Sequence, residues 1–276
     1  MKQSNLACVL SIAGTDPSGG AGIHADIKAI SATGGYAAAV VTALVAQNTQ
    51  GVQTIEAVSA DFVQQQLESV FTDVTINAVK IGMLHDQRII KVICKTLASF
   101  KPNPVVFDPV MVAKDGSLLL HMETMTMLKE DLFPLVHLIT PNLFEAEQLL
   151  QYEITNKAVM QAAAVELGKA YDIHVLIKGG HLNASVAPDV LYDVKANQCH
   201  WFEEKRVETK NTHGTGCSLS SAIASYLAQG LTLIDAVKTA KHYISRAIES
   251  GKDYSLGKGN GPIDHFYFLG NRCHDH

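Results

Sequence analysis

Short runs of apolar residues alternate along the chain with segments that place apolar residues at helical spacing. The apolar runs predict buried strands at residues 6–13, 37–46, 78–83, 105–107, 136–140 and 174–178. Between them, apolar residues recur every three or four positions, as at Ile23, Ile27 and Ile30 and again over residues 157–171. Regular alternation of strand and helix predicts a parallel sheet with helices on both faces.

The pattern changes near residue 190. Apolar stretches at 190–194 and 199–202 flank Lys195-Ala196-Asn197, which predicts a small antiparallel hairpin, and two helical patterns follow it. No Pro/Ser-rich linker, repeat or low-complexity segment interrupts the chain. We therefore expect one doubly wound α/β domain over residues 1–276, with a mostly parallel sheet. In such sheets, ligands bind at the carboxyl ends of the strands.

Composition and charge exclude several partners. Hydrophobic residues make up 47% of the chain and charged residues 18%, and the formal net charge is −5. A chain with this charge has no overall basic field for nucleic acid. The densest basic set is expected to be the solvated face of a C-terminal helix, and it comprises Lys238, Lys241, His242 and Arg246.

The N-terminal apolar run is short and ends in a polar glycine loop, so it is expected to be a strand, not a signal peptide. No apolar stretch has the length of a membrane span. The cysteines are five, dispersed and without a C-x-x-C pair, which favours a reducing cytoplasm. The histidines have no metal-ligand spacing, and the loop residues His85, His121 and His181 are expected to be polar surface groups. A glycosylation tripeptide at 183–185 has no meaning without secretion.

The most informative segment is Asn211-Thr212-His213-Gly214-Thr215-Gly216-Cys217. The residues after it, from Leu219 to Leu227, follow helical spacing, and Gly230 stands where a helix C-cap glycine belongs. The glycines therefore lie at a helix N-terminus, where free N–H groups and the helix dipole attract an anion. The same field favours the thiolate of Cys217. An anion cradle beside a reactive thiol is half of a group-transfer site.

A second glycine loop joins the first predicted strand to the first helix, from Gly14 to Gly22. It lacks the Lys-Ser/Thr of a Walker A loop. Gly20-Ala21-Gly22-Ile23-His24-Ala25 fits the dinucleotide fingerprint G-x-G-x-x-A, yet Gln47 stands near the position of the ribose-binding acid. The loop is thus either a tight strand–helix turn or part of an NAD site.

Polar residues follow several of the predicted strands. The adjacent amides Gln47 and Asn48 suit a planar heterocycle, although they could equally cap loop backbone. Asp26, one turn into the first helix, is expected from local sequence to face solvent or to compensate the helix dipole. Further along, Asp108 and Glu145 offer the oxygen ligands that Mg²⁺ prefers, and Lys178 could contact phosphate. Asn142 and Glu145 also have the spacing of a capping box, and both roles can hold together.

Six segments in order closely resemble the hydroxymethylpyrimidine/phosphomethylpyrimidine kinases of thiamine biosynthesis, a family of the ribokinase-like superfamily. The segments span nearly the whole chain, and they lie at residues 13–23, 42–49, 80–84, 140–143, 178–181 and 210–217. Two departures are His24, where members commonly have Gln, and the tail beyond Ile263. The resemblance implies a ribokinase-like fold and an ATP-dependent, Mg²⁺-assisted kinase. It implies phosphorylation of 4-amino-5-hydroxymethyl-2-methylpyrimidine and then of its monophosphate, and a homodimer.

The resemblance also implies roles for single residues. The implied pyrimidine contacts are Gln47, Met83, Gly14, Asp26 and Val110. The implied anion hole for the transferring phosphoryl group is Gly214, Thr215, Gly216 and Cys217. The implied ATP contacts are Lys178, Asn142 and Thr212, with Asp108 and Glu145 around the metal. Cys217, as thiolate, would orient or deprotonate the substrate hydroxyl in place of the aspartate of most ribokinase relatives.

Three alternatives stay open at this point. A pyridoxal kinase of the same subfamily shares the glycine–cysteine segment, although the pyridoxal-directed members differ at the position of Gln47. An NAD-dependent oxidoreductase would use Gly20 and Gly22 but leaves residues 214–217 unexplained. A non-catalytic pyrimidine-binding protein would keep the pocket without turnover, and the intact Cys217 and Lys178 argue against it.

Overall fold

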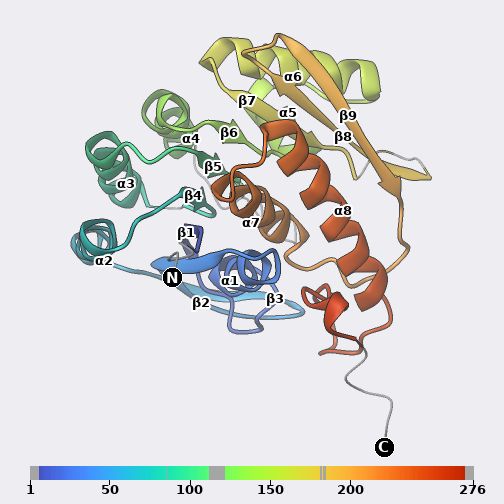
Figure 1. The fold of residues 1–276 in the computed structure, drawn as a ribbon, viewed down its shortest axis with the longest axis horizontal. Helices are drawn as coiled ribbons and strands as arrows, with labels where there is room; N and C mark the ends of the chain where they lie inside the picture. The colour runs from blue at the N-terminus through green and yellow to red at the C-terminus, as the bar shows by residue number, and fades with distance from the viewer. Residues whose placement is uncertain (1–5, 85, 112–121, 181, 183–184, 271–276) are drawn as a thin grey trace, which may run out of the picture.

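The computed structural model describes residues 6–84, 86–111, 122–180, 182 and 185–270 (Figure 1). Several sequence predictions concern residues outside these ranges, namely His85, His121, His181, Asn183 with Ala184 in the glycosylation tripeptide, and the tail 271–276. Within the described ranges, none of the helices combines the length and the apolar composition that a membrane span requires.

The described strands form one sheet in the order β3-β2-β1-β4-β5-β6-β7-β8-β9. Their bounds are β1 (Cys8–Gly14), β2 (Tyr36–Asn48), β3 (Gly51–Ala57), β4 (Ala78–Ile81), β5 (Val105–Phe107), β6 (Leu138–Ile139), β7 (His174–Lys178), β8 (Val186–Asp193) and β9 (Gln198–Lys205). The six central strands of this order, β2, β1, β4, β5, β6 and β7, are parallel. On one side β3 pairs antiparallel with β2, and on the other side β8 pairs antiparallel with β7. The predicted hairpin is confirmed as the antiparallel pair β8–β9.

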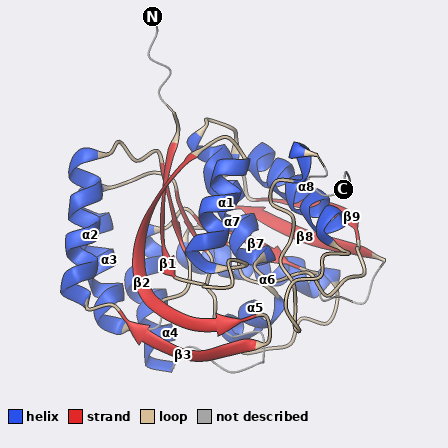
Figure 2. Ribbon diagram, turned by 90° about the horizontal axis from the view of Figure 1, so that it is seen from below, coloured by secondary structure: helices blue, strands red, loops and turns tan. Residues whose placement is uncertain are grey.

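The strand β3 was not predicted from the sequence. It runs beside the end of β2 (Figure 2) and pairs antiparallel with it. In this register, Gln47 lies opposite Val52 and Asn48 opposite Gly51. Gln47 and Asn48 are therefore strand residues, and the prediction that they form a loop after the strand is wrong. The side chains of β3 are mostly exposed at the edge of the sheet. An exposed edge strand has no continuous apolar run, which is the signal that revealed the other strands.

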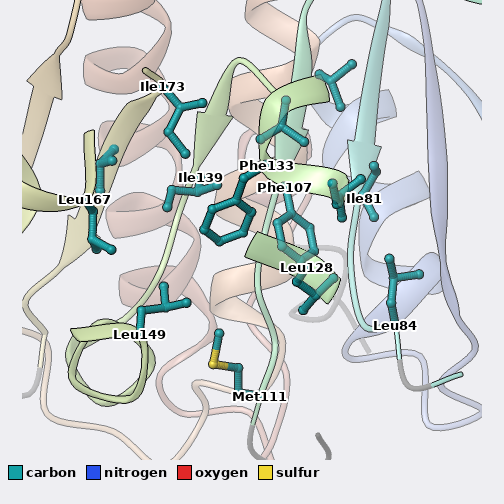
Figure 3. Close-up of a cluster of buried hydrophobic side chains, with 14 of the residues drawn as sticks. Ile81, Leu84, Phe107, Met111, Leu128, Phe133, Ile139, Leu149, Leu167 and Ile173 are labelled. Atoms are coloured by element: carbon teal, nitrogen blue, oxygen red, sulfur yellow. The ribbon is translucent and has the colours of Figure 1, made fainter. Parts of the chain in front are cut away.

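Helices cover both faces of the sheet, as a doubly wound fold requires (Figure 1). One face carries α1 (Gly22–Ala32), α7 (Thr215–Ala228) and α8 (Leu233–Gly251); the other carries α2 (Ala60–Asp73), α3 (Gln87–Phe100), α4 (Met122–Met127), α5 (Leu143–Leu150) and α6 (Lys157–Tyr171). The short π-helix η1 (Leu128–Leu132) and the 3-10 helices η2 (Phe133–Leu135) and η3 (Tyr267–Leu269) complete the described elements. Each face has its own apolar cluster. Figure 3 shows part of the cluster on the face that α2 to α6 cover, around Phe107 and Phe133.

The helix α7 is buried more completely than its sequence predicts. Leu219, Ala222 and Ile223 pack into the core as expected, but α1 and α8 cover the flanks of the helix as well. Its polar positions are serines whose hydroxyl groups find partners inside the protein, such as Ser221 on Asp26 and Ser218 on His265. A helix fixed on this many sides holds its N-terminus in a defined place.

Two charged positions are buried against expectation. Lys241 on α8 is not part of a solvated face, because its ammonium group lies 2.7 Å from Asp189 and the side chain is largely buried. On α1, Ile27 is exposed, and the helix instead turns Asp26 into the protein with Ala29 and Ile30. Lys241 and Asp26 find their partners in distant parts of the chain, so local spacing could not place them.

Candidate active site

The candidate active site lies at the carboxyl ends of the central parallel strands, where strand order reverses between β1 and β4. Gly14 ends β1 and Met83 follows β4, and a Cβ added to Gly14 would lie 3.1 Å from Met83 Cε. Val110 follows β5, half-buried, with its N–H donating to the carbonyl of Asp108. The structure thus places Gly14, Met83 and Val110 at or just beyond the ends of three neighbouring strands, β1, β4 and β5. The half-buried Gln47 lies on β2, beside β1.

Asp26 lies beneath this edge, fully buried. Its carboxylate accepts hydrogen bonds from Lys80 Nζ (2.8 and 2.9 Å), Ser11 Oγ (2.6 Å) and Ser221 Oγ (2.8 Å). The prediction from local sequence that Asp26 faces solvent is wrong, because α7 packs against α1 and covers it. Both carboxylate oxygens already have protein partners, and direct contact with a substrate stays a prediction.

Lys80 is a site residue that the sequence reasoning did not assign. Its side chain is fully buried, and burial opposes its charge, but Asp26 and the more distant Cys217 and Asp108 raise the pKa of Lys80 above its ordinary value. The available signal was a lysine inside the apolar strand Ala78-Val79-Lys80-Ile81. A buried strand tolerates such a residue only with a counter-charge, which points to a paired carboxylate nearby.

The anion cradle predicted at residues 214–217 is the N-terminus of α7. Gly214 is the N-cap in a left-handed conformation (φ 77°), and no side chain caps the first turn. A Cβ at Gly214 would overlap the carbonyl oxygen of Gly20, so the two glycine loops pack backbone to backbone. Thr212 and Thr215 form the turn into the helix, with Thr215 Oγ1 donating to the Thr212 carbonyl at 2.8 Å. Uncapped N–H groups at a helix N-terminus form an anion site.

Lys178 and Asp108 lie directly beside this cradle. Lys178 Nζ is 2.7 Å from Asp108 Oδ1, and a Cβ on Gly216 would lie 3.2 Å from the same ammonium group. Burial opposes the charge of Asp108, but Lys178 and Lys80 hold its pKa below the ordinary value. Burial likewise opposes the charge of Lys178, yet Asp108 and Glu145 raise its pKa. The predicted phosphate-contacting lysine, metal-binding aspartate and anion loop are therefore adjacent.

Asn142 and Glu145 form the predicted capping box at the start of α5. The Asn142 N–H donates to Glu145 Oε2 (2.7 Å), and the Glu145 N–H donates to Asn142 Oδ1 (2.9 Å). Burial raises the pKa of Glu145 to about 7. Lys178 acts against this shift, and the negative charge of Asp108 adds to it. A bound cation would stabilise the charged carboxylate of Glu145, which burial disfavours. Asp108 and Glu145 therefore suit Mg²⁺ as oxygen ligands, although the described residues contain no cluster of three or more His, Cys, Asp or Glu that would hold a metal alone.

The surroundings of Cys217 act on its thiol in opposite directions. The helix N-terminus favours the thiolate. Burial raises the pKa of Cys217 to about 11, with Asp26 and Asp108 acting in the same direction and Lys80 against it. Burial thus favours the neutral thiol, and the expected thiolate stays a prediction. The other described cysteines, Cys8, Cys94 and Cys199, are also free.

The first glycine loop does not form an open dinucleotide cradle. A Cβ on Gly20 would overlap the ring of His213, and one on Gly22 would overlap the carbonyl of Gly14. The glycines of G-x-G-x-x-A thus permit close packing against the second loop. His24 accepts a hydrogen bond from the Asp16 N–H through Nδ1 (3.1 Å), a bond that a glutamine carbonyl could also accept.

Comparison with known proteins gives consistent results. A family model described as phosphomethylpyrimidine kinase matches residues 16–264. The hydroxymethylpyrimidine/phosphomethylpyrimidine kinase of Escherichia coli (strain K12) is 44% identical over 269 residues, covering 97% of this chain and 99% of that protein. The thiamine biosynthesis bifunctional protein ThiED of Geobacter sulfurreducens is 46% identical over 93% of this chain, but only 52% of that protein is covered. The chain spans about half the length of such bifunctional relatives.

Solved structures give the same picture. The phosphomethylpyrimidine kinase from Clostridium difficile 630 is 40% identical with a TM-score of 0.78, covering 88% of this chain and 100% of that chain. The pyridoxal kinase from Staphylococcus aureus in complex with AMP-PCP and pyridoxal is 30% identical with a TM-score of 0.86, covering 96% of both chains. The likeness extends over nearly the whole described fold.

Proposed function

Because the chain belongs to the phosphomethylpyrimidine kinase family, we propose that it transfers phosphoryl groups from ATP to a hydroxymethylpyrimidine. Its fold is the ribokinase-like α/β fold of the solved relatives. The substrates we propose are 4-amino-5-hydroxymethyl-2-methylpyrimidine and, in a second step, its monophosphate. This reaction belongs to thiamine biosynthesis, as the names of the relatives indicate.

One observation carries the proposal: the uncapped N-terminus of α7 lies against Lys178 and Asp108. Phosphoryl transfer has little covalent chemistry for a protein to supply, so positioning and charge stabilisation dominate. The N–H groups of Gly216 and Cys217 would stabilise the charge on the transferring group. Lys178 would contact ATP phosphates, with Thr212 and Asn142 as further ATP contacts at the rim.

The pyrimidine would bind at the ends of β1, β2, β4 and β5. Gln47 would pair with the aminopyrimidine edge through its amide, Met83 would pack on the ring, and Gly14 and Val110 would line the pocket. Asp26, with Lys80, would support this pocket from below. In the first step, the hydroxymethyl oxygen would attack the terminal phosphorus of ATP and release its proton to solvent, with ADP as leaving group. In the second step, a phosphate oxygen of the monophosphate would attack in the same way.

Cys217 would orient the attacking hydroxyl as a neutral thiol. Its raised pKa disfavours a resting thiolate, so general-base action would require a fall in that pKa when substrates bind. Asp108 and Glu145 would hold Mg²⁺, which when bound supplies charge neutralisation at the phosphate oxygens. The raised pKa of Glu145 supports a cation site there.

The decisive experiment measures ADP release with the hydroxymethylpyrimidine, its monophosphate and pyridoxal side by side. We expect turnover of the first two. Turnover of pyridoxal alone would overturn the proposal in favour of a pyridoxal kinase. This second candidate is supported by the likeness to the Staphylococcus aureus enzyme, and a slower side activity on pyridoxal is compatible with both. A chain that binds the pyrimidine without releasing ADP would instead be a non-catalytic binding protein.

The proposed assembly is a homodimer in the cytoplasm. A partner could cover the apolar residues that β2 exposes, since Leu44 is 54% exposed and Tyr36 55%. Light scattering after size exclusion tests this assembly, and Leu44→Glu should shift a dimer toward monomer. A wild-type mass of one chain would contradict the dimer.

A further inference from the structure

The carboxylate of Asp16 accepts several hydrogen bonds within the first glycine loop. It is fully buried, and its oxygens accept hydrogen bonds from the N–H groups of Ser18 (2.9 Å), Gly20 (3.1 Å) and Ala21 (2.7 Å). The Ser18 hydroxyl adds a fourth bond at 2.6 Å. A carboxylate with this many donors fixes the course of the backbone around it.

His213 connects the Asp16 carboxylate to the second glycine loop. Its Nε2 lies 2.7 Å from Asp16 Oδ2, across 197 residues of sequence. The ring lies against Gly20, and the His213 N–H donates to the Gly261 carbonyl at 3.0 Å. His213 immediately precedes Gly214, the N-cap of α7. Its position therefore bears directly on where the anion cradle begins.

The same loop is tied to the strand that carries Gln47. Thr15 donates its N–H to the Ala43 carbonyl (2.9 Å), and Thr15 Oγ1 accepts from the Val45 N–H (3.0 Å). Burial alone would raise the pKa of Asp16, but hydrogen bonds from His213, Ser18 and Gln47 hold that pKa well below its ordinary value. The loop thus contacts the recognition strand on one side and the anion cradle on the other.

We infer that Asp16 and His213 are a positioning pair that fixes the recognition residue Gln47 relative to the anion cradle at Gly214. Neither residue needs to touch the reacting atoms. This inference rests on the proposed function, because it assigns Gln47 to the substrate and residues 214–217 to the phosphoryl group. Its consequence is that loss of the pair weakens substrate selection and phosphoryl transfer together, although the two subsites lie on different elements.

The test compares His213→Ala, which removes the ring, with His213→Gln, which keeps a side-chain N–H donor. His242→Ala is the matched control, since His242 pairs with Glu204 on the surface, outside the site. We expect His213→Ala to lower kcat about tenfold, to raise KM for the hydroxymethylpyrimidine several-fold, and to lower its preference over pyridoxal. His213→Gln should recover most of both parameters, and His242→Ala should match wild type.

Coupling to Gln47 is tested in a Gln47→Ala background. There, His213→Ala should no longer raise KM for the pyrimidine but should still lower kcat. An equal KM effect in both backgrounds would overturn the coupling, and so would wild-type kinetics of His213→Ala. A loss that His213→Gln fails to recover, with an equal loss of melting temperature in both variants, would indicate a purely structural role.

A measurement without turnover separates this inference from the proposed function. In the unliganded protein, the side-chain amide NMR signals of Gln47 should shift in His213→Ala and stay unchanged in His242→Ala. Unchanged Gln47 signals in a folded His213→Ala protein would overturn the positioning pair. If the wild type fails to phosphorylate the pyrimidine while these signals shift, the proposed function fails, whereas the coupling of His213 to Gln47 stands.

Discussion

The ammonium group of Lys80 lies 2.8 Å from Asp26 Oδ1, and neither side chain has any exposed surface. Removing one member of such a pair leaves an uncompensated buried charge. We therefore expect Lys80→Met to lower the free energy of unfolding by about 3–5 kcal/mol. Urea unfolding monitored by circular dichroism measures the change.

Two further variants make this prediction specific. Lys80→Met combined with Asp26→Asn should regain much of the lost stability, because no charge is left buried. Lys157→Met is the exposed control, since its partner Glu203 is at the surface, and it should change stability by less than about 1 kcal/mol. Equal losses for Lys80→Met and Lys157→Met would contradict the importance of burial.

Gly214→Ala should be strongly destabilising and nearly inactive. The left-handed backbone (φ 77°) disfavours any Cβ, and here the Cβ would also overlap the Gly20 carbonyl. We expect a loss of more than about 2 kcal/mol. Gly230→Ala is the matched control, because Gly230 is also left-handed (φ 91°) but has nothing within 4 Å of the added Cβ. It should lose about 1 kcal/mol and keep full activity. Similar melting temperatures for the two variants would argue against close packing of the loops.

Cys217 should be a slow target for alkylation near neutral pH. Because its pKa is raised to about 11, the rate of its modification by iodoacetamide, followed by peptide mass spectrometry, should keep rising above pH 9. A rate that levels off near pH 7 would show a thiolate in the resting enzyme.

The kinetics of Cys217 variants separate orientation from base catalysis. We expect Cys217→Ala to lower kcat about tenfold to a hundredfold, with a much smaller rise in KM. Cys217→Ser, which keeps a hydrogen-bonding group, should retain more activity than the alanine variant if the thiol orients the substrate. Near wild-type turnover of Cys217→Ala would eliminate both roles.

Glu145 should make stability depend on pH. Its pKa is raised from 4.5 to about 7, so the protonated form favours the folded state, and this contribution is lost as pH rises through about 7. Glu145→Gln mimics the protonated acid and keeps an acceptor for the capping box. From about pH 5 to pH 8, the variant should gain on the order of 2 kcal/mol relative to wild type. A stability difference independent of pH, measured by thermal unfolding without Mg²⁺, would contradict the raised pKa.

Much of the fold could be predicted because buried apolar runs mark the central strands and the amphipathic helices. The strands β5 and β7 and the helix α6 have the predicted bounds. Lys178 and Asp108 could be predicted to lie at one edge because parallel strands bring their carboxyl ends together. The anion loop follows the antiparallel strand β9, so only the family resemblance placed it beside them. In contrast, the exposed edge strand β3 carries no such apolar signal.

The remainder depends on contacts between distant segments. The pairing of Lys80 with Asp26 and of His213 with Asp16 joins residues whose local sequence indicates nothing about the partner. The thiol of Cys217 shows the same limit. Its place at a helix N-terminus was visible in the sequence, but the burial and the two carboxylates that raise its pKa come from other elements.

The site is closed by contacts between early and late parts of the chain. Asp16 meets His213 across 197 residues, and Thr49 Oγ1 accepts from the Gly259 N–H across 210 residues. Such closures are slow steps in folding because a long loop must be ordered first. During synthesis, the first glycine loop and the recognition strand therefore emerge long before the segments that hold them in place. A nascent chain gains the complete pocket only after residues 213 and 259 have been translated.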